Sequence, residues 1–180
     1  MWALAYFLVF AAVLTMAAAM YYGHLHALTL HSYAEELYGA KLQAASAQPA
    51  SYSDFASFSA ACRRGEAAVW VERGRTLGRC ASARVGRAEY RFTAYVVGVE
   101  WGLDWRGAPA YIVALYVSVV PPHFDLGFYV RPRGGEWAEA PSAGWSGDGA
   151  SFIYYVPVPP GAELKVADWP FEAVLNPPAP

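Results

Sequence analysis

Three histidines near the start of the chain, His24, His26 and His31, are the first residues that could do chemistry. On a helix His24 and His31 would share a face at a seven-residue step. Metal-binding pairs on a helix usually follow a four-residue step, as in HExxH, which this sequence lacks. Helices of neighbouring chains can build metal or haem sites between them. We favour an interfacial or subunit-contact role for these histidines and expect no metal site.

His123 and Asp125 form a second candidate pair. The G-x-S-x-G elbow that would present a nucleophile beside such a pair is absent, as are a P-loop, a dinucleotide fingerprint and a calcium loop. The methionines are Met1, Met16 and Met20, so the C-terminal part of the chain cannot supply the axial methionine of a copper electron-transfer site. We therefore expect no catalytic residue, no cofactor and no small-molecule substrate.

The two cysteines, Cys62 and Cys80, are too far apart for a redox CxxC pair or half of a zinc site. In an exported domain two cysteines usually form a disulfide, whereas two independent buried thiols are the alternative. We expect the disulfide.

The first 34 residues contain no Asp, Glu, Lys or Arg. Within them, Trp2–Tyr22 is an unbroken apolar run, about 31 Å long as a helix, which matches the core of a bilayer. Aromatic residues lie at both ends of the run, where amphipathic rings prefer the membrane interfaces. The run predicts a transmembrane helix.

Three interpretations of this opening segment compete. It could be a cleavable secretory signal with a processing site at Ala17-Ala18-Ala19, a permanent single-span anchor, or the start of one long helix from Trp2 to about Ala47. A signal peptide has a basic n-region and a shorter apolar stretch, so the sequence favours retention as an anchor or a long helix.

Beyond the apolar run, Leu30, Tyr33, Leu37 and Tyr38 recur at three- and four-residue steps. This spacing predicts that the helix continues with an amphipathic half, whose apolar stripe packs against other helices. The helix should end before Pro49, because proline cannot continue it. A short span followed by a flexible polar stalk is the alternative.

Charge and composition limit the location and the partners. The flank after the apolar run is poor in Lys and Arg, which is typical of the translocated side, so we expect residues 50–180 outside the cytoplasm. The net charge of −2, without a dense basic run, gives no basis for nucleic-acid binding. Asparagine and glutamine are sparse, which fits a heat-adapted source, with a high genomic GC content as the alternative.

The rest of the chain predicts a linker over residues 48–66 and one exported all-β domain over residues 67–180, with no useful helix after Pro49. Short β-prone runs separated by turn residues and prolines are typical of a β-sandwich. The expected strands are Ala67–Glu72, Ala88–Trp101, Ala110–Val120, Leu126–Arg131, Ser151–Val158, Glu163–Ala167 and Phe171–Leu175. The turn residues of 102–107 predict a hairpin between the second and third of these strands.

A glycine-rich loop from Pro132 to Ala150 contains Trp137 and Trp145. Loops of this length in a compact domain are often functional, and exposed tryptophans there could contact a partner subunit or a carbohydrate. The alternative is that both rings fold back and cover the sandwich.

The segments Trp2–Tyr22, Leu25–Leu42 and Ala67–Leu175 together resemble the type IV pilin-like subunits of archaeal surface filaments. The resemblance lies in a long N-terminal helix, apolar first and amphipathic later, that leads into a small exported β-domain. It implies a structural filament subunit, with the helix in the filament core and the β-domain outside, that assembles with copies of itself.

Two other functions remain open from the sequence. One is a membrane-anchored accessory subunit of a respiratory or transport complex, with His24 or His31 near a cofactor of a partner. The other is a tethered cell-surface binding module that uses the loop of Trp137 and Trp145.

Overall fold

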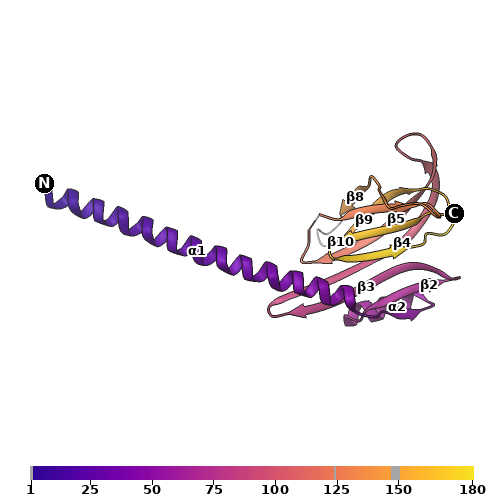
Figure 1. Cartoon of the computed structure of the whole chain (residues 1–180), viewed down its shortest axis with the longest axis horizontal. Helices are drawn as coiled ribbons and strands as arrows, with labels where there is room; N and C mark the ends of the chain where they lie inside the picture. Colours follow the sequence, from indigo (N-terminus) through magenta and orange to yellow (C-terminus); the bar gives the residue numbers. More distant parts are fainter. Residues whose placement is uncertain (1, 124, 147–150) are drawn as a thin grey trace. The chain divides into compact units, whose positions relative to one another are not determined.

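The computed structural model describes the backbone of residues 2–123, 125–146 and 151–180, and the side chains of residues 10–123, 125–142 and 151–180. The chain divides into two compact units, Met1–Glu36 and Leu37–Pro180. The first unit is helical. The second contains the end of that helix and a domain built mainly of β-strands (Figure 1).

Helix α1 runs without a break from Trp2 to Ser46, which confirms the predicted long N-terminal helix. Alanine and leucine, both strong helix formers, are frequent in it, and no proline interrupts it. The helix ends shortly before Pro49, as expected from the missing N–H of proline.

The transmembrane character of α1 is not confirmed. Among the described residues, no helix is long and apolar enough to span a membrane. The first part of the predicted span, residues 2–9, lies outside the residues whose side chains the structure describes.

The predicted linker over residues 48–66 is wrong, because this segment forms strand β1, Ala50–Tyr52, and helix α2, Phe55–Arg64. Asp54 begins α2 as its N-cap, and its side chain accepts a hydrogen bond from the backbone N–H of Ser57 at 2.8 Å. Gly65 ends α2 in the left-handed conformation, with φ of 81°. The expectation of no helix after Pro49 overlooked these two caps.

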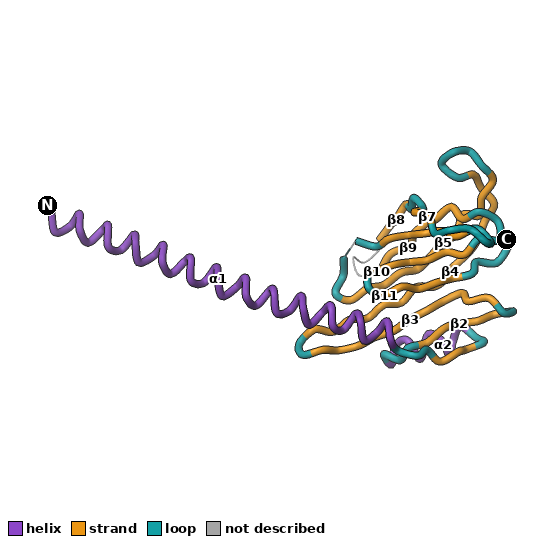
Figure 2. The backbone as a smooth tube through the Cα atoms, in the orientation of Figure 1, coloured by secondary structure: helices purple, strands orange, loops and turns teal. Residues whose placement is uncertain are grey.

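The strands form two sheets, of seven and four strands (Figure 2). The seven-stranded sheet has the order β1, β2 (Ala68–Glu72), β3 (Arg75–Val85), β4 (Ala88–Leu103), β5 (Pro109–Val120), β9 (Ser151–Val158) and β8 (Ala143–Ser146). The four-stranded sheet has the order β11 (Phe171–Leu175), β10 (Glu163–Asp168), β6 (Gly127–Arg131) and β7 (Ala138–Glu139).

Both sheets contribute side chains to one hydrophobic core. Alternate residues of β4 and β5 are buried, as the period of two in a strand requires. Phe92 of β4 contacts Phe171 of β11 across the core, with 4.8 Å between the ring centroids. The predicted β-rich architecture with two sheets is therefore confirmed, although α2 means that the domain is not entirely β.

A smaller core lies between α2 and the seven-stranded sheet, where Phe58 and Ala61 of α2 are buried beside Cys80. Cys62 of α2 and Cys80 of β3 form a disulfide, with 5.8 Å between their Cα atoms, which confirms the predicted pairing. Gly78 of β3 lets the aromatic ring of Phe58 approach the sheet, because a Cβ at this position would lie 3.0 Å from that ring.

The predicted hairpin of Ala88–Trp101 with Ala110–Val120 is present as β4 and β5. Strand β3 was not expected, because its small and charged residues, RTLGRCASARV, give no regular alternation of apolar side chains. It is a strand because it pairs with β2 on one side and with β4 on the other.

Candidate functional site

A buried polar cluster forms where the end of α1 meets the β-domain. It consists of Lys41 of α1, Asp168 at the end of β10, His123 after β5, and Tyr90 of β4. The Lys41 ammonium donates a short hydrogen bond to Asp168 Oδ1, and His123 Nε2 lies 3.0 Å from the same oxygen. His123 was expected to pair with Asp125, but the structure pairs it with Asp168.

The His123 ring faces a hydrogen-bond acceptor at each nitrogen. Nδ1 lies 2.9 Å from the carbonyl oxygen of Pro121, and Nε2 faces the Asp168 carboxylate. The nitrogens of Lys41 and His123 thus lie beside the same carboxylate oxygen of Asp168.

The Asp168 side chain is only 3% exposed, so its charge is tolerated because it is paired. The hydroxyl of Tyr90 is buried, and burial first, then the nearby charge of Asp168, raise the pKa of this tyrosine. Within the described residues neither the Tyr90 hydroxyl nor Asp168 Oδ2 has a partner in hydrogen-bond geometry. The Asp168 carboxylate therefore acts on the Tyr90 hydroxyl through its charge.

The polar cluster fixes the last turns of α1 to the β-domain. Leu37, Ala40 and Ala44 recur at three- and four-residue steps and pack against the domain's own core, with both alanines fully buried. Lys41 lies on the same stretch and adds the ion pair. The cluster offers no activated nucleophile. Its ion pair attaches the last turns of α1 to strand β10.

The expected helix-packing residues divide into two groups. Leu37 is partly buried against the core of its own β-domain, so it does not pack against other helices as expected. Leu30, Tyr33 and Tyr38 are exposed, and their packing against other helices stays a prediction. Over the last turns of α1, the β-domain of the same chain covers the apolar stripe.

The histidines of α1 do not gather into a metal site. All three are exposed, and His31 Nε2 lies 3.3 Å from a carboxylate oxygen of Glu35, one helical turn later. In the part of the chain that the structure describes, no group of three or more His, Cys, Asp or Glu side chains could hold a metal ion.

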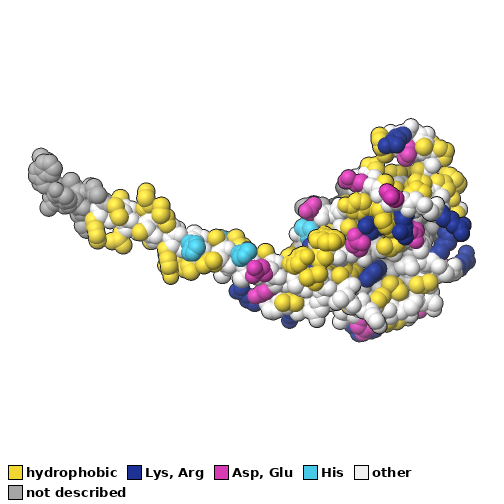
Figure 3. Space-filling view, viewed as in Figure 1, with side chains coloured by type: hydrophobic (Ala, Val, Ile, Leu, Met, Phe, Trp, Pro, Cys, Tyr) yellow, Lys and Arg dark blue, Asp and Glu magenta, His cyan; other side chains and the backbone are white. Residues whose placement is uncertain are grey.

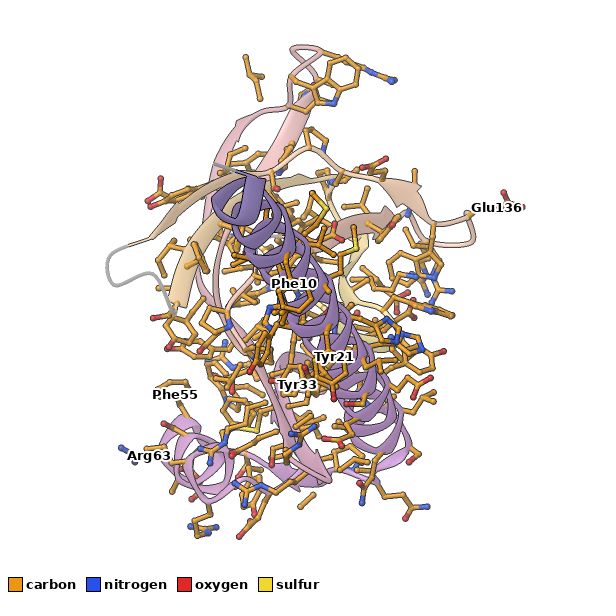
Figure 4. The ribbon with its side chains drawn as sticks, turned by 90° about the vertical axis from the view of Figure 1, so that its left-hand side faces the viewer. Phe10, Tyr21, Tyr33, Phe55, Arg63 and Glu136 are labelled. Carbon is orange, nitrogen blue, oxygen red and sulfur yellow. A yellow bond between two sulfur atoms is a disulfide. The ribbon has the colours of Figure 1, made fainter. Side chains whose placement is uncertain are left out.

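Every described residue of α1 from Phe10 to His31 is exposed (Figure 3). Figure 4 shows Phe10, Tyr21 and Tyr33 extending from the α1 ribbon. Apolar side chains do not collect on one side when the whole of α1 is considered. The large exposed apolar residues of this stretch are Phe10, Val13, Leu14, Met16, Met20, Tyr21, Tyr22, Leu25, Leu28 and Leu30.

Trp137 folds back onto the four-stranded sheet. Its half-buried ring lies near two cations, with Arg131 at 4.6 Å and Lys165 at 4.9 Å from the ring centroid. This position favours the covering role over the partner contact for Trp137. The side chain of Trp145 lies outside the residues whose side chains are described.

The turn between β4 and β5 carries exposed apolar residues that the sequence analysis treated only as a connection. Trp101, Leu103 and Trp105 are 64%, 64% and 66% exposed. Two tryptophans and a leucine within five positions at a hairpin turn were a visible signal, because turns are usually polar.

We compared the chain with models of protein families, with curated proteins and with solved structures. None of the three comparisons finds a match.

Proposed function

We propose that this chain is a structural subunit of an extracellular surface filament of the type IV pilin-like kind, with α1 in the filament core and the β-domain outside. The observation that carries the proposal is the exposure of α1 from Phe10 to His31 on every face. An apolar helix that none of the described residues of its own chain covers needs a partner to remove its side chains from water.

Copies of α1 are suitable partners for one another. Ala11, Ala12 and Ala17–Ala19 are small side chains that would let neighbouring helices approach closely. From Phe10 to Ala34 there is no Asp, Glu, Lys or Arg whose charge would be buried by such packing. A helical core assembled from many copies would therefore exclude water around the whole circumference of α1.

The β-domain suits the outside of a filament. The Cys62–Cys80 disulfide is of a kind that persists in oxidising compartments, and it supports a location outside the cytoplasm. The polar cluster of Lys41, Asp168 and His123 would hold each domain on its helix at a fixed position. A regular filament requires this, because every subunit must present the same surfaces.

A single-span anchor is the second candidate, and the uncharged run Trp2–Tyr22 supports it. In that arrangement lipid covers the first part of α1, and the chain serves as an accessory subunit of a membrane complex or as a tethered binding module. The two candidates differ at Leu28, which is exposed and lies beyond the apolar run. Leu28 meets other helices in a filament and faces water beside an anchor.

The test is Leu28→Glu, with Gln43→Glu as a matched control that adds the same charge at an exposed polar position of α1. Cells expressing each variant are sheared, and the chain is quantified in the sheared fraction and in the membrane fraction. We expect Leu28→Glu to abolish recovery in the sheared fraction, because it buries an unpaired carboxylate between helices. Gln43→Glu should behave like the wild type.

Two results would contradict the proposal. One is a wild-type chain that stays entirely with the membrane after shearing, which fits the anchor. The other is recovery of Leu28→Glu filaments at the wild-type level, which would mean that Leu28 meets no other helix.

A further inference from the structure

A cleft of about 370 Å³ opens on the seven-stranded sheet beside α2. Helix α2 forms a wall of this cleft with Ser59, Cys62 and Arg63. Strands β4 and β5 form its floor with three cross-strand pairs, which are Arg91 with Val120, Thr93 with Ser118, and Tyr95 with Tyr116. We call this space the sheet cleft.

The sheet cleft lies on the face of the sheet that points away from the hydrophobic core. Side chains alternate between the two faces of a strand, and the intervening residues of β4, Phe92 and Ala94, are buried in the core. Arg91, Thr93 and Tyr95 therefore share the opposite face and line the cleft side by side.

The wall of the sheet cleft is fixed to its floor. The disulfide joins Cys62 of α2 to Cys80 of β3, and β3 pairs with β4. Phe58 of α2 is fully buried in the small core beneath the helix. A site whose walls are already in place loses little conformational entropy when it binds a ligand.

The sheet cleft carries an excess of positive charge. Among the described residues that line it, Arg63 and Arg91 are charged and no side chain is acidic. Arg91 donates a hydrogen bond to Glu89, but the same carboxylate also accepts one from Arg84, so two guanidinium groups share one negative charge. Arg63 extends from α2 and has no ion-pair partner in the described part of the chain (Figure 4). The cleft therefore favours an anionic ligand.

The rest of the lining combines hydroxyl groups with apolar surface. Neither the Ser59 nor the Thr93 hydroxyl is hydrogen-bonded to another described residue. Tyr95 and Tyr116 stack at one end of the floor, with 4.8 Å between their ring centroids. A ligand that matches this lining has hydroxyl groups and an apolar face in addition to its negative charge.

We propose that the sheet cleft binds an acidic saccharide, in which sugar rings carry carboxylate groups. The sugar carboxylate faces Arg63 and Arg91. Sugar hydroxyl groups form hydrogen bonds with Ser59 and Thr93, and an apolar C–H face of a sugar ring lies against the tyrosine rings. The inference goes beyond the filament function and does not depend on it, because one copy contains the whole cleft.

Two simpler ligands match the sheet cleft less well. An inorganic anion such as phosphate would use the guanidinium groups and leave the hydroxyl groups and the tyrosine rings without a contact. A neutral sugar would leave the guanidinium groups without a carboxylate. Both ligands therefore serve as competitors in the test.

The test is binding of trigalacturonate, labelled at its reducing end with an uncharged fluorophore, to the full-length chain in detergent micelles. Fluorescence anisotropy should show saturable binding of one probe per chain. Unlabelled trigalacturonate should release the probe, whereas phosphate and maltotriose at the same concentration should not. The absence of saturable binding would overturn the proposal. Release by phosphate would indicate a site for the anion alone, and release by maltotriose a site that does not depend on the carboxylate, so either result would also overturn it.

A matched pair of variants tests whether the probe binds in the sheet cleft. Arg63→Gln should raise the dissociation constant at least about tenfold, because it removes a charge-assisted contact with the carboxylate. Arg133→Gln removes the same charge at an exposed position of another turn and should leave the constant unchanged. Equal weakening by both variants would mean that overall charge alone attracts the probe, and it would refute the cleft.

The floor of the sheet cleft is tested by Thr93→Val. This substitution keeps a β-branched side chain of similar shape in strand β4 and removes only the hydroxyl group. We expect the dissociation constant to rise about threefold to tenfold, as for the loss of a neutral hydrogen bond. Binding at the wild-type level would show that the saccharide does not reach the floor and would contradict the assigned contacts.

Discussion

Leu25 and Leu115 are the same side chain in opposite surroundings. Leu25 on α1 is 41% exposed, whereas Leu115 on β5 is fully buried between the two sheets. The β-domain therefore buries an apolar core within the chain, whereas the described residues of α1 from Phe10 to His31 are all exposed. This difference separates the part of the molecule that provides stability from the part that adds no buried apolar core.

The same substitution at both leucines tests this difference and should give the largest effect. Leu115→Ala is expected to lower the free energy of unfolding by about 2–5 kcal/mol, because it leaves a cavity in the core. Leu25→Ala should leave it unchanged. Chemical denaturation of the full-length chain, followed by near-UV circular dichroism, measures both. Equal losses would mean that Leu25 also belongs to a folded core.

The joint between α1 and the β-domain gives the next effect. Asp168→Ala should cost about 3 kcal/mol of folding free energy, since it leaves the Lys41 ammonium partly buried without its partner. Replacing both residues, as Lys41→Met with Asp168→Leu, should recover most of the loss. A double variant that is no more stable than Asp168→Ala would show that the ion pair is not the source.

The disulfide should contribute a similar or smaller amount. Cys62→Ser with Cys80→Ser is expected to lower the free energy of unfolding by about 3 kcal/mol, because the bridge closes a loop with a separation of 18 residues. Thiol labelling of the folded wild type without reductant should modify neither cysteine. Labelling of both would contradict the bridge.

The smallest effect concerns alkaline pH and Tyr90. Its pKa is raised in the folded chain above the usual value of 10.0, so the unfolded chain loses this proton first as the pH rises. The free energy of unfolding should therefore fall above about pH 10. Tyr90→Phe should fall less steeply, although Tyr95 and Tyr154, whose pKa values are also raised, will keep part of the slope. Identical pH profiles would mean that Tyr90 ionises equally in both states.

The sequence predicted the features that depend on neighbouring residues. An apolar run followed by apolar residues at three- and four-residue steps predicted α1, and two β-prone runs joined by turn residues predicted the hairpin of β4 and β5. The disulfide followed from the compartment and the cysteine count. These patterns are local or compositional, so no tertiary contact was needed to read them.

The features that were missed depend on contacts between distant segments. Lys41 and Asp168 are 127 positions apart, so no local pattern could pair them. The composition of β3 does not predict a strand. It is a strand because it pairs with both neighbours, β2 and β4. The apolar stripe over Leu37 was recognised, but its partner was assigned to other helices because the core of the β-domain could not be placed beside it from the sequence.

The most direct test of the filament proposal is whether assembly covers α1. Met20→Cys places one reactive thiol on the exposed stretch, because both native cysteines are bridged. Maleimide labelling is compared between sheared filaments and the same material dissociated in detergent. We predict that the thiol is protected in the filaments and is labelled after dissociation. Equal labelling in both states would contradict the packing of α1 in a filament core.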